Sequence, residues 1–177
     1  MKIEDDFLDQ KEFDELQTLM LGPNFAWHYI VGIDYEWQKN KFMFDHILYD
    51  DGVPRSPFLE KLNTIIKIIQ PMSLWRIKAN LLTRTPNIIE NSFHVDMADL
   101  KEFPEKLKQW TTSIFYVNTN NGYTKFEDGT KVESVANRMV SFPSNMKHTG
   151  TSCTDEKTRI VINFNYYSDR KPWNTYG

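Results

Sequence analysis

The first forty residues alternate apolar and polar positions in two different patterns, first that of a helix and then that of a strand. Asp9 and Glu12 form a capping box at the start of a helical pattern that ends at Gly22. The apolar positions of that pattern fall on one helical face, namely Phe13, Leu16, Leu19 and Met20. After Gly22 the pattern changes, and aromatic and β-branched residues predict strands at 25–33 and 42–49.

A second helical pattern follows these strands. Ser56 is the expected cap, Pro57 takes the first helical position, and Pro71 ends the segment. Its apolar face consists of Leu62, Ile65, Ile66 and Ile69. The sequence therefore predicts two amphipathic helices before residue 72, each with one face to bury.

Beyond residue 73 the pattern becomes a series of short strands separated by turn residues. The predicted strands are 74–84, 93–96, 110–118, 123–126, 131–135, 138–142 and 159–167. Many short strands at close spacing favour a mainly β (α+β) fold, a jelly roll or cupin-like double-stranded β-helix with the two helices packed on one sheet. With no repeat or long linker, we expect one domain over 1–177, with a helical lead-in at 1–72 and a jelly-roll core at about 73–168.

Composition narrows the partners and the compartment. The formal net charge is -3, so no strongly basic field indicates a nucleic-acid or membrane-surface partner. The single cysteine, Cys153, excludes an intramolecular disulfide and a cysteine-based zinc knuckle. Because the acidic start lacks a secretory pattern and no apolar run is long enough to span a bilayer, we expect a cytoplasmic protein.

Three residues form a candidate metal site. His94 and Asp96 are two residues apart in a predicted strand, so their side chains share a face. His148 follows a later strand and turn, and a sheet that folds back can bring it beside them. Two imidazoles and one carboxylate make the facial triad of non-haem Fe(II) oxygenases, which leaves three coordination positions open. Downstream, Arg159 offers the planar guanidinium that binds the carboxylate of a dicarboxylate ligand.

Two other classes of protein fit part of this pattern. Two histidines and one aspartate also suit zinc or manganese in a cupin-like hydrolase or isomerase. Arg159 counts against that class, because a metal that activates water needs no clamp for a distant carboxylate. The other alternative is a jelly-roll binding or structural module without chemistry.

Three amides on the predicted strands are further candidates. Asn163 and Asn165 share a face with Arg159 on the last strand, and Asn80 lies in an otherwise apolar strand. Amides that face a pocket need hydrogen-bonding partners. We expect all three to contribute to cosubstrate binding, or alternatively to satisfy backbone groups or buried water.

From residue 74 to 167 the sequence resembles the 2-oxoglutarate/Fe(II) oxygenases, and within them the prolyl-4-hydroxylase-like branch, including short proteins found in cyanophages. The resemblance starts from His94-Val95-Asp96, His148 and Arg159, which match the family's His-x-Asp…His…Arg order. Three further pieces follow the same order, namely the aromatic strand 114–118, a Gly-Gly-x-Thr-like turn at 122–126 with Tyr123 in place of the second glycine, and the strand 137–142.

The resemblance implies a role for each matched residue. His94, Asp96 and His148 would bind Fe(II), Arg159 would bind the distal carboxylate of 2-oxoglutarate, and Tyr116 would help to hold that carboxylate. Dioxygen and 2-oxoglutarate would be consumed, with release of succinate and carbon dioxide, and Asp96 favours hydroxylation because related halogenases have a small residue at its position.

The substrate implied by the resemblance is a peptide or protein side chain or a small molecule, and a phage-encoded member would act in the host-cell cytoplasm. The charged segment 97–109, which directly follows the triad, is expected to be a solvated loop or short helix, or else a flap on the substrate side. The sequence carries no signal for an oligomeric state.

Overall fold

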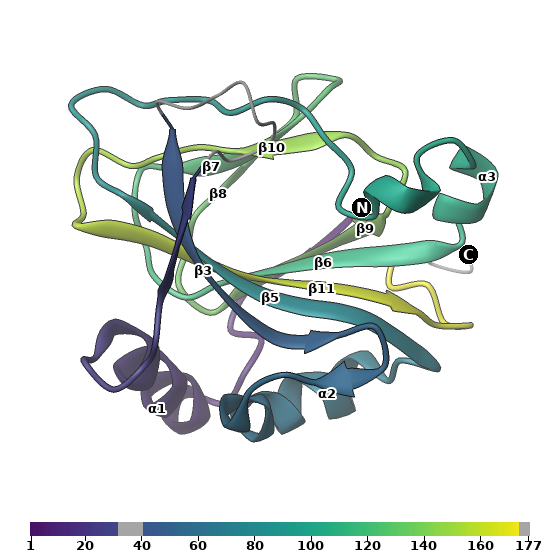
Figure 1. The fold of residues 1–177 in the computed structure, drawn as a ribbon, viewed down its shortest axis with the longest axis horizontal. Helices are drawn as coiled ribbons and strands as arrows, with labels where there is room; N and C mark the ends of the chain where they lie inside the picture. The colour runs from purple at the N-terminus through teal and green to yellow at the C-terminus, as the bar shows by residue number, and fades with distance from the viewer. Residues whose placement is uncertain (32–40, 174–177) are drawn as a thin grey trace.

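The computed structural model describes residues 1–31 and 41–173, so the last two residues of the strand predicted at 25–33 lie outside the described residues. These residues form two antiparallel sheets (Figure 1). The large sheet has the strand order β1-β9-β6-β11-β5-β3-β2, with β4 beside β3, and the small sheet has the order β10-β7-β8. The strands of the large sheet are β1 (Lys2–Glu4), β2 (His28–Val31), β3 (Phe42–Asp50), β4 (Val53–Pro54), β5 (Ser73–Thr83), β6 (Trp110–Tyr116), β9 (Arg138–Pro143) and β11 (Thr158–Tyr167). Those of the small sheet are β7 (Tyr123–Phe126), β8 (Lys131–Glu133) and β10 (His148–Gly150). The expected mainly β, two-sheet architecture is confirmed.

Helices from the first 70 residues cover one face of the large sheet. Helix α1 (Gln10–Leu21) begins at Asp9, whose side chain accepts a hydrogen bond from the backbone of Lys11. The second helical segment begins at Ser56 as a 3₁₀ helix, η1 (Pro57–Leu62), and continues as α2 (Asn63–Ile69). Figure 1 shows α1 and α2 against the same side of the sheet, as the apolar faces in the sequence predict.

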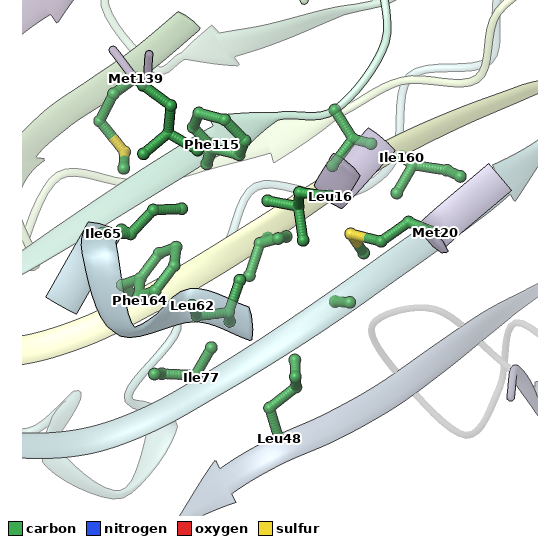
Figure 2. Close-up of a cluster of buried hydrophobic side chains, with 14 of the residues drawn as sticks. Leu16, Met20, Leu48, Leu62, Ile65, Ile77, Phe115, Met139, Ile160 and Phe164 are labelled. Carbon is green, nitrogen blue, oxygen red and sulfur yellow. The ribbon is translucent and has the colours of Figure 1, made fainter. Parts of the chain in front are cut away.

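The main hydrophobic core lies between these helices and the large sheet (Figure 2). Because side chains alternate along a strand, every second residue of β5 and β11 faces the helices. Ile77, Ala79, Ile162 and Phe164 are examples, and each is fully buried. The opposite face of the same strands is therefore free to form a second interior.

Replacing Ile65 with Ala is expected to lower the free energy of unfolding by about 2–5 kcal/mol, because the side chain is 1% exposed in this core. Ile68 lies on the same helix but is 48% exposed, so Ile68→Ala is the matched control and should change stability by less than about 0.5 kcal/mol. Urea denaturation of both variants measures the difference. Equal losses would contradict the assigned core face.

The second interior lies between the two sheets. Its apolar residues come from β6, β7, β8, β9 and β11, and they are Ile114, Tyr116, Phe126, Val132, Val140, Phe142 and Val161. This packing holds the small sheet over the large one. The sequence-predicted site residues of β11 face this side.

Two local predictions need correction. The predicted strand at 93–96 forms only one β-bridge, between His94 and His148, because the segment meets its neighbour at a single pair before turning away. The sequence does not predict strands β1, β4 and β10, since two or three residues carry no periodic signal, and the partner of β1, β9, comes more than 130 residues later in the chain. Among the described residues no helix is long and apolar enough to cross a membrane.

Candidate metal and cosubstrate site

The two metal-site segments meet through their backbones. His94 and Asp96 lie in the connection after β5, and His148 is the first residue of β10. Reciprocal hydrogen bonds join the backbones of His94 and His148, each 3.0 Å long. Their rings therefore lie side by side, with centroids 5.0 Å apart. The structure thus brings the predicted triad together, although the chain separates its halves.

The donor atoms of the triad converge on one point. Nε2 of His94 lies 3.6 Å from Oδ1 of Asp96, and Nε2 of His148 lies 3.7 Å from the same oxygen. All three ligand atoms lie within 4.8 Å of one another. Donors that share an ion through bonds of about 2.1 Å are separated by about 3.0–3.4 Å, so small side-chain shifts accommodate a metal.

The contacts of the two Nδ1 atoms also favour metal binding through Nε2. Nδ1 of His94 lies 3.1 Å from the Ser92 carbonyl, and Nδ1 of His148 lies 3.2 Å from the Met146 carbonyl. A carbonyl accepts hydrogen bonds, so each Nδ1 keeps its proton, and each Nε2 offers a lone pair to a metal once a metal displaces the proton that it shares with Asp96. The residues therefore fit a divalent metal ion.

Asp96 is held in its ionised form. Its side chain is 3% exposed, and burial alone would raise the pKa of its carboxyl group. The interaction with His94 and the nearby His148 and Arg76 outweigh burial and keep this pKa well below its usual range. Oδ2 accepts hydrogen bonds from Nδ2 of Asn165 at 3.0 Å and of Asn163 at 3.4 Å. Oδ1 is thereby left to face the two imidazoles.

Arg159 lies in the same cavity, away from the triad. It is 1% exposed, and its Nε donates to Ser134 Oγ at 2.8 Å while Nη2 donates to Thr124 Oγ1 at 3.1 Å. Burial lowers the pKa of this guanidinium. Within 1–31 and 41–173 no carboxylate pairs with it, and a buried charge without a counter-ion is costly.

Thr124 links Arg159 to Tyr116. Tyr116 is fully buried, burial raises the pKa of its hydroxyl, and that hydroxyl donates to Thr124 Oγ1 at 2.8 Å. Oγ1 of Thr124 therefore accepts two hydrogen bonds, from Tyr116 and Arg159, and these use both of its lone pairs. Its own proton remains to donate, and Thr124 lines the cavity. The guanidinium and this hydroxyl together suit an anionic oxygen.

Both groups open into one cavity of about 490 Å³ between the sheets, with the triad and Arg159 among its lining residues. That volume is in the range of small-molecule sites.

No model of a known protein family and no curated protein matches the sequence. Solved structures, in contrast, match over nearly the whole chain. A Trichoplax adhaerens prolyl hydroxylase, in complex with a hypoxia inducible factor oxygen degradation domain peptide fragment, matches with a TM-score of 0.63 and 16% identity, over 96% of this chain and 84% of that one.

Two more structures agree. The non-heme alpha ketoglutarate dependent epimerase SnoN from nogalamycin biosynthesis matches with a TM-score of 0.64 and 15% identity, over 94% of this chain and 75% of that one. A Pseudomonas putida prolyl-4-hydroxylase matches with a TM-score of 0.56 and 12% identity, over 94% of this chain and 92% of that one.

This chain has the fold of the 2-oxoglutarate/Fe(II) oxygenases.

Within this oxygenase fold, the other predicted site residues differ in whether they line the cavity. Asn80 and Asn163 line the cavity. Asn165 is fully buried and is not among the described lining residues, and its amide contacts Asp96 and Thr112. Tyr116 likewise reaches the cavity only through Thr124.

Replacing Asn165 with Ala is expected to weaken Fe(II) binding by about 10–100-fold, because Oδ2 of the ligand Asp96 loses its shorter amide hydrogen bond. Asn80→Ala is the matched control, since Asn80 lies on the neighbouring strand of the same cavity but makes no hydrogen bond to Asp96 within the described chain. Anaerobic metal titration compares the two. An affinity equal to that of the parent in Asn165→Ala would show that this amide does not position Asp96.

The sequence pattern predicts no role for Thr124 or Arg76, which both line the cavity. Thr124 stood within the recognised turn, and that motif was the available signal. Arg76 alternates with Lys78 and Asn80 along β5, so its face could be inferred but its proximity to Asp96 could not.

The segment 97–109 contains two short helices, η2 (Ala98–Leu100) and α3 (Pro104–Leu107), in agreement with the expectation of a solvated loop or short helix. Ala98 and Lys101 line the cavity beside the triad. A flap on the substrate side stays a hypothesis that this position favours.

Proposed function

We propose that this protein is an Fe(II)- and 2-oxoglutarate-dependent dioxygenase that hydroxylates a peptide or protein side chain or a small molecule. The observation that carries the proposal is Arg159. This buried cation has no carboxylate partner within the described residues and shares a cavity with a candidate three-residue metal site, and 2-oxoglutarate has a carboxylate at each end. A zinc hydrolase would leave this cation without a use.

In this proposal His94, Asp96 and His148 hold the iron through Nε2, Oδ1 and Nε2. Arg159 binds the distal carboxylate of 2-oxoglutarate, with a hydrogen bond from the Thr124 hydroxyl, and Tyr116 positions Thr124. When bound, iron, 2-oxoglutarate and dioxygen supply the oxidising chemistry, with succinate, carbon dioxide and a hydroxylated product as its outcome.

The walls of the cavity support this use. The apolar residues between the sheets keep bulk water away from the Arg159 end, which strengthens charge interactions there. The asparagines of β11 orient Asp96. We place the activity in the cytoplasm, in keeping with a chain that carries one buried thiol, Cys153.

The decisive experiment is anaerobic addition of Fe(II) and then 2-oxoglutarate to the purified protein, with the visible charge-transfer band of the chelate as readout. We expect a band that requires both additions. Folded protein that shows no band would overturn the proposal and direct attention to metal analysis, since zinc, manganese or a binding module without metal would then explain the cavity.

A further inference from the structure

The cavity wall is far more basic than the protein as a whole. The chain has 24 acidic and 21 basic residues. Of the described residues that line the cavity, only Asp96 is a carboxylate, whereas five are cations, namely Arg76, Lys78, Lys101, Lys147 and Arg159. Such an excess of one sign concentrates anionic ligands.

Part of this charge is balanced by partners within the protein. Lys78 pairs with Asp45 at 2.9 Å, and Lys147 pairs with Glu127 at 3.3 Å. In the proposed enzyme, the metal and Arg159 together balance 2-oxoglutarate and Asp96. Among the described residues Arg76 and Lys101 have no remaining carboxylate to balance them, so the cavity keeps a positive charge even with its cosubstrate.

Arg76 is the more informative of the two. Its Nη2 donates to the backbone carbonyl of Asp96 at 3.1 Å and lies 3.9 Å from Oδ1 of that carboxylate, at the outer limit of an ion pair. Its Nε is buried and has no hydrogen-bond partner in the described structure. A bound metal would also engage Asp96, and Arg76 would then stand beside a cationic centre with no counter-ion of its own.

Arg76 and Lys78 also lie at the same height on the large sheet as the residues that contact Asp96. On β5 they face the cavity opposite Asn165 and Asn163, the two residues that hold Asp96, whereas Arg159 lies opposite Leu82. Six residues of strand, about 20 Å, therefore separate Arg76 from the backbone position of Arg159. The two arginines serve different ends of the cavity. Arg76 is 25% exposed along its side chain and Lys78 is 23% exposed, so both are accessible to a ligand.

We propose that the substrate carries a carboxylate, on a free acid or on an acidic side chain of a peptide, and that Arg76 binds it beside the metal. This inference rests on the proposed function, because it takes Arg159 as the site of the cosubstrate. The substrate is therefore anionic, and a neutral isostere of it binds weakly.

Pairs of ligands that match in shape and differ in charge test the idea on the protein loaded anaerobically with Fe(II) and 2-oxoglutarate. The free pairs are N-acetyl-L-alanine with N-acetyl-L-alaninamide and propanoate with propanamide, so that the amide of each pair carries no carboxylate. The peptide pairs are acetylated and amidated five-residue peptides with Asp or Asn, or Glu or Gln, between alanines. Perturbation of the charge-transfer band gives the affinity of each. We expect at least one acid to bind about tenfold or more tightly than its amide. Preference among the free acids assigns the carboxylate to a small molecule, and preference among the peptides assigns it to a protein.

Arg76→Gln should abolish that preference without changing the half-saturating concentration of 2-oxoglutarate. Lys67→Gln removes the same charge from an exposed position on α2 and should keep the preference. Equal binding of every acid and its amide to the parent overturns the inference while the chelate band upholds the enzyme. The inference is also overturned if Arg76→Gln weakens the binding of 2-oxoglutarate and keeps the preference for the acid, because Arg76 would then bind the cosubstrate. Absence of the band in the parent removes the proposed function and this inference with it.

Discussion

The His94→Ala variant is expected to lose tight Fe(II) binding and to stay folded. Its side chain is 32% exposed, so truncation opens no deep core cavity. The loss should exceed about 100-fold, since removal of a residue that merely supports a ligand already costs about 10–100-fold. Anaerobic Fe(II) titration measures the affinity, and circular dichroism checks the fold.

The control for this prediction is His28→Ala. His28 is an exposed histidine on β2 and does not belong to the triad. It should bind Fe(II) like the parent. If His94→Ala also binds Fe(II) with the affinity of the parent, the metal lies elsewhere and the assigned ligands are wrong.

Arg159→Ala is expected to bind Fe(II) normally and 2-oxoglutarate poorly. Truncation of one partner of a buried, hydrogen-bonded charge pair costs about 2–5 kcal/mol, which corresponds to a loss of roughly 30-fold or more in affinity. The metal site should be spared, because Arg159 bonds to Thr124 and Ser134 rather than to the triad. Titration of 2-oxoglutarate by the charge-transfer band measures the effect.

Two variants make this result interpretable. Arg159→Lys keeps the charge but not the planar fork, so its affinity should fall between those of the parent and Arg159→Ala. Arg84→Ala removes an exposed arginine just after β5 and should change nothing. Parental 2-oxoglutarate affinity in folded Arg159→Ala would place the distal carboxylate on another residue.

Most of the secondary structure could be predicted because its signals are local. The helical face of Phe13 and Leu16 and the strand alternation around Ile162 arise from residues a few positions apart. The segment at 93–96 has the composition of a strand and yet makes one bridge, since its pairing depends on how far β10 runs beside it. Strand β1 depends in the same way on a partner from the other end of the sequence.

The candidate site divides along the same line. The sequence indicated the candidate metal ligands through the spacing of His94 and Asp96 and the position of His148 after them. It also indicated Arg159 as the cationic residue that follows them. The sequence also placed Asn163 and Asn165 on the face of Arg159. A role for them in cosubstrate binding stays a prediction, and the structure adds that their amides hydrogen-bond to Asp96.

The sequence by itself determined the two main helical segments, most of the strands, the jelly-roll class and the residue types of the candidate metal site, because periodicity and spacing act over a few residues. Only the tertiary structure decided that Asn165 holds Asp96, that Thr124 joins Tyr116 to Arg159, and that Arg76 stands beside the triad. Those contacts join strands distant in the chain, and their partners follow from sheet register and from the packing of two sheets, which no short stretch of sequence specifies.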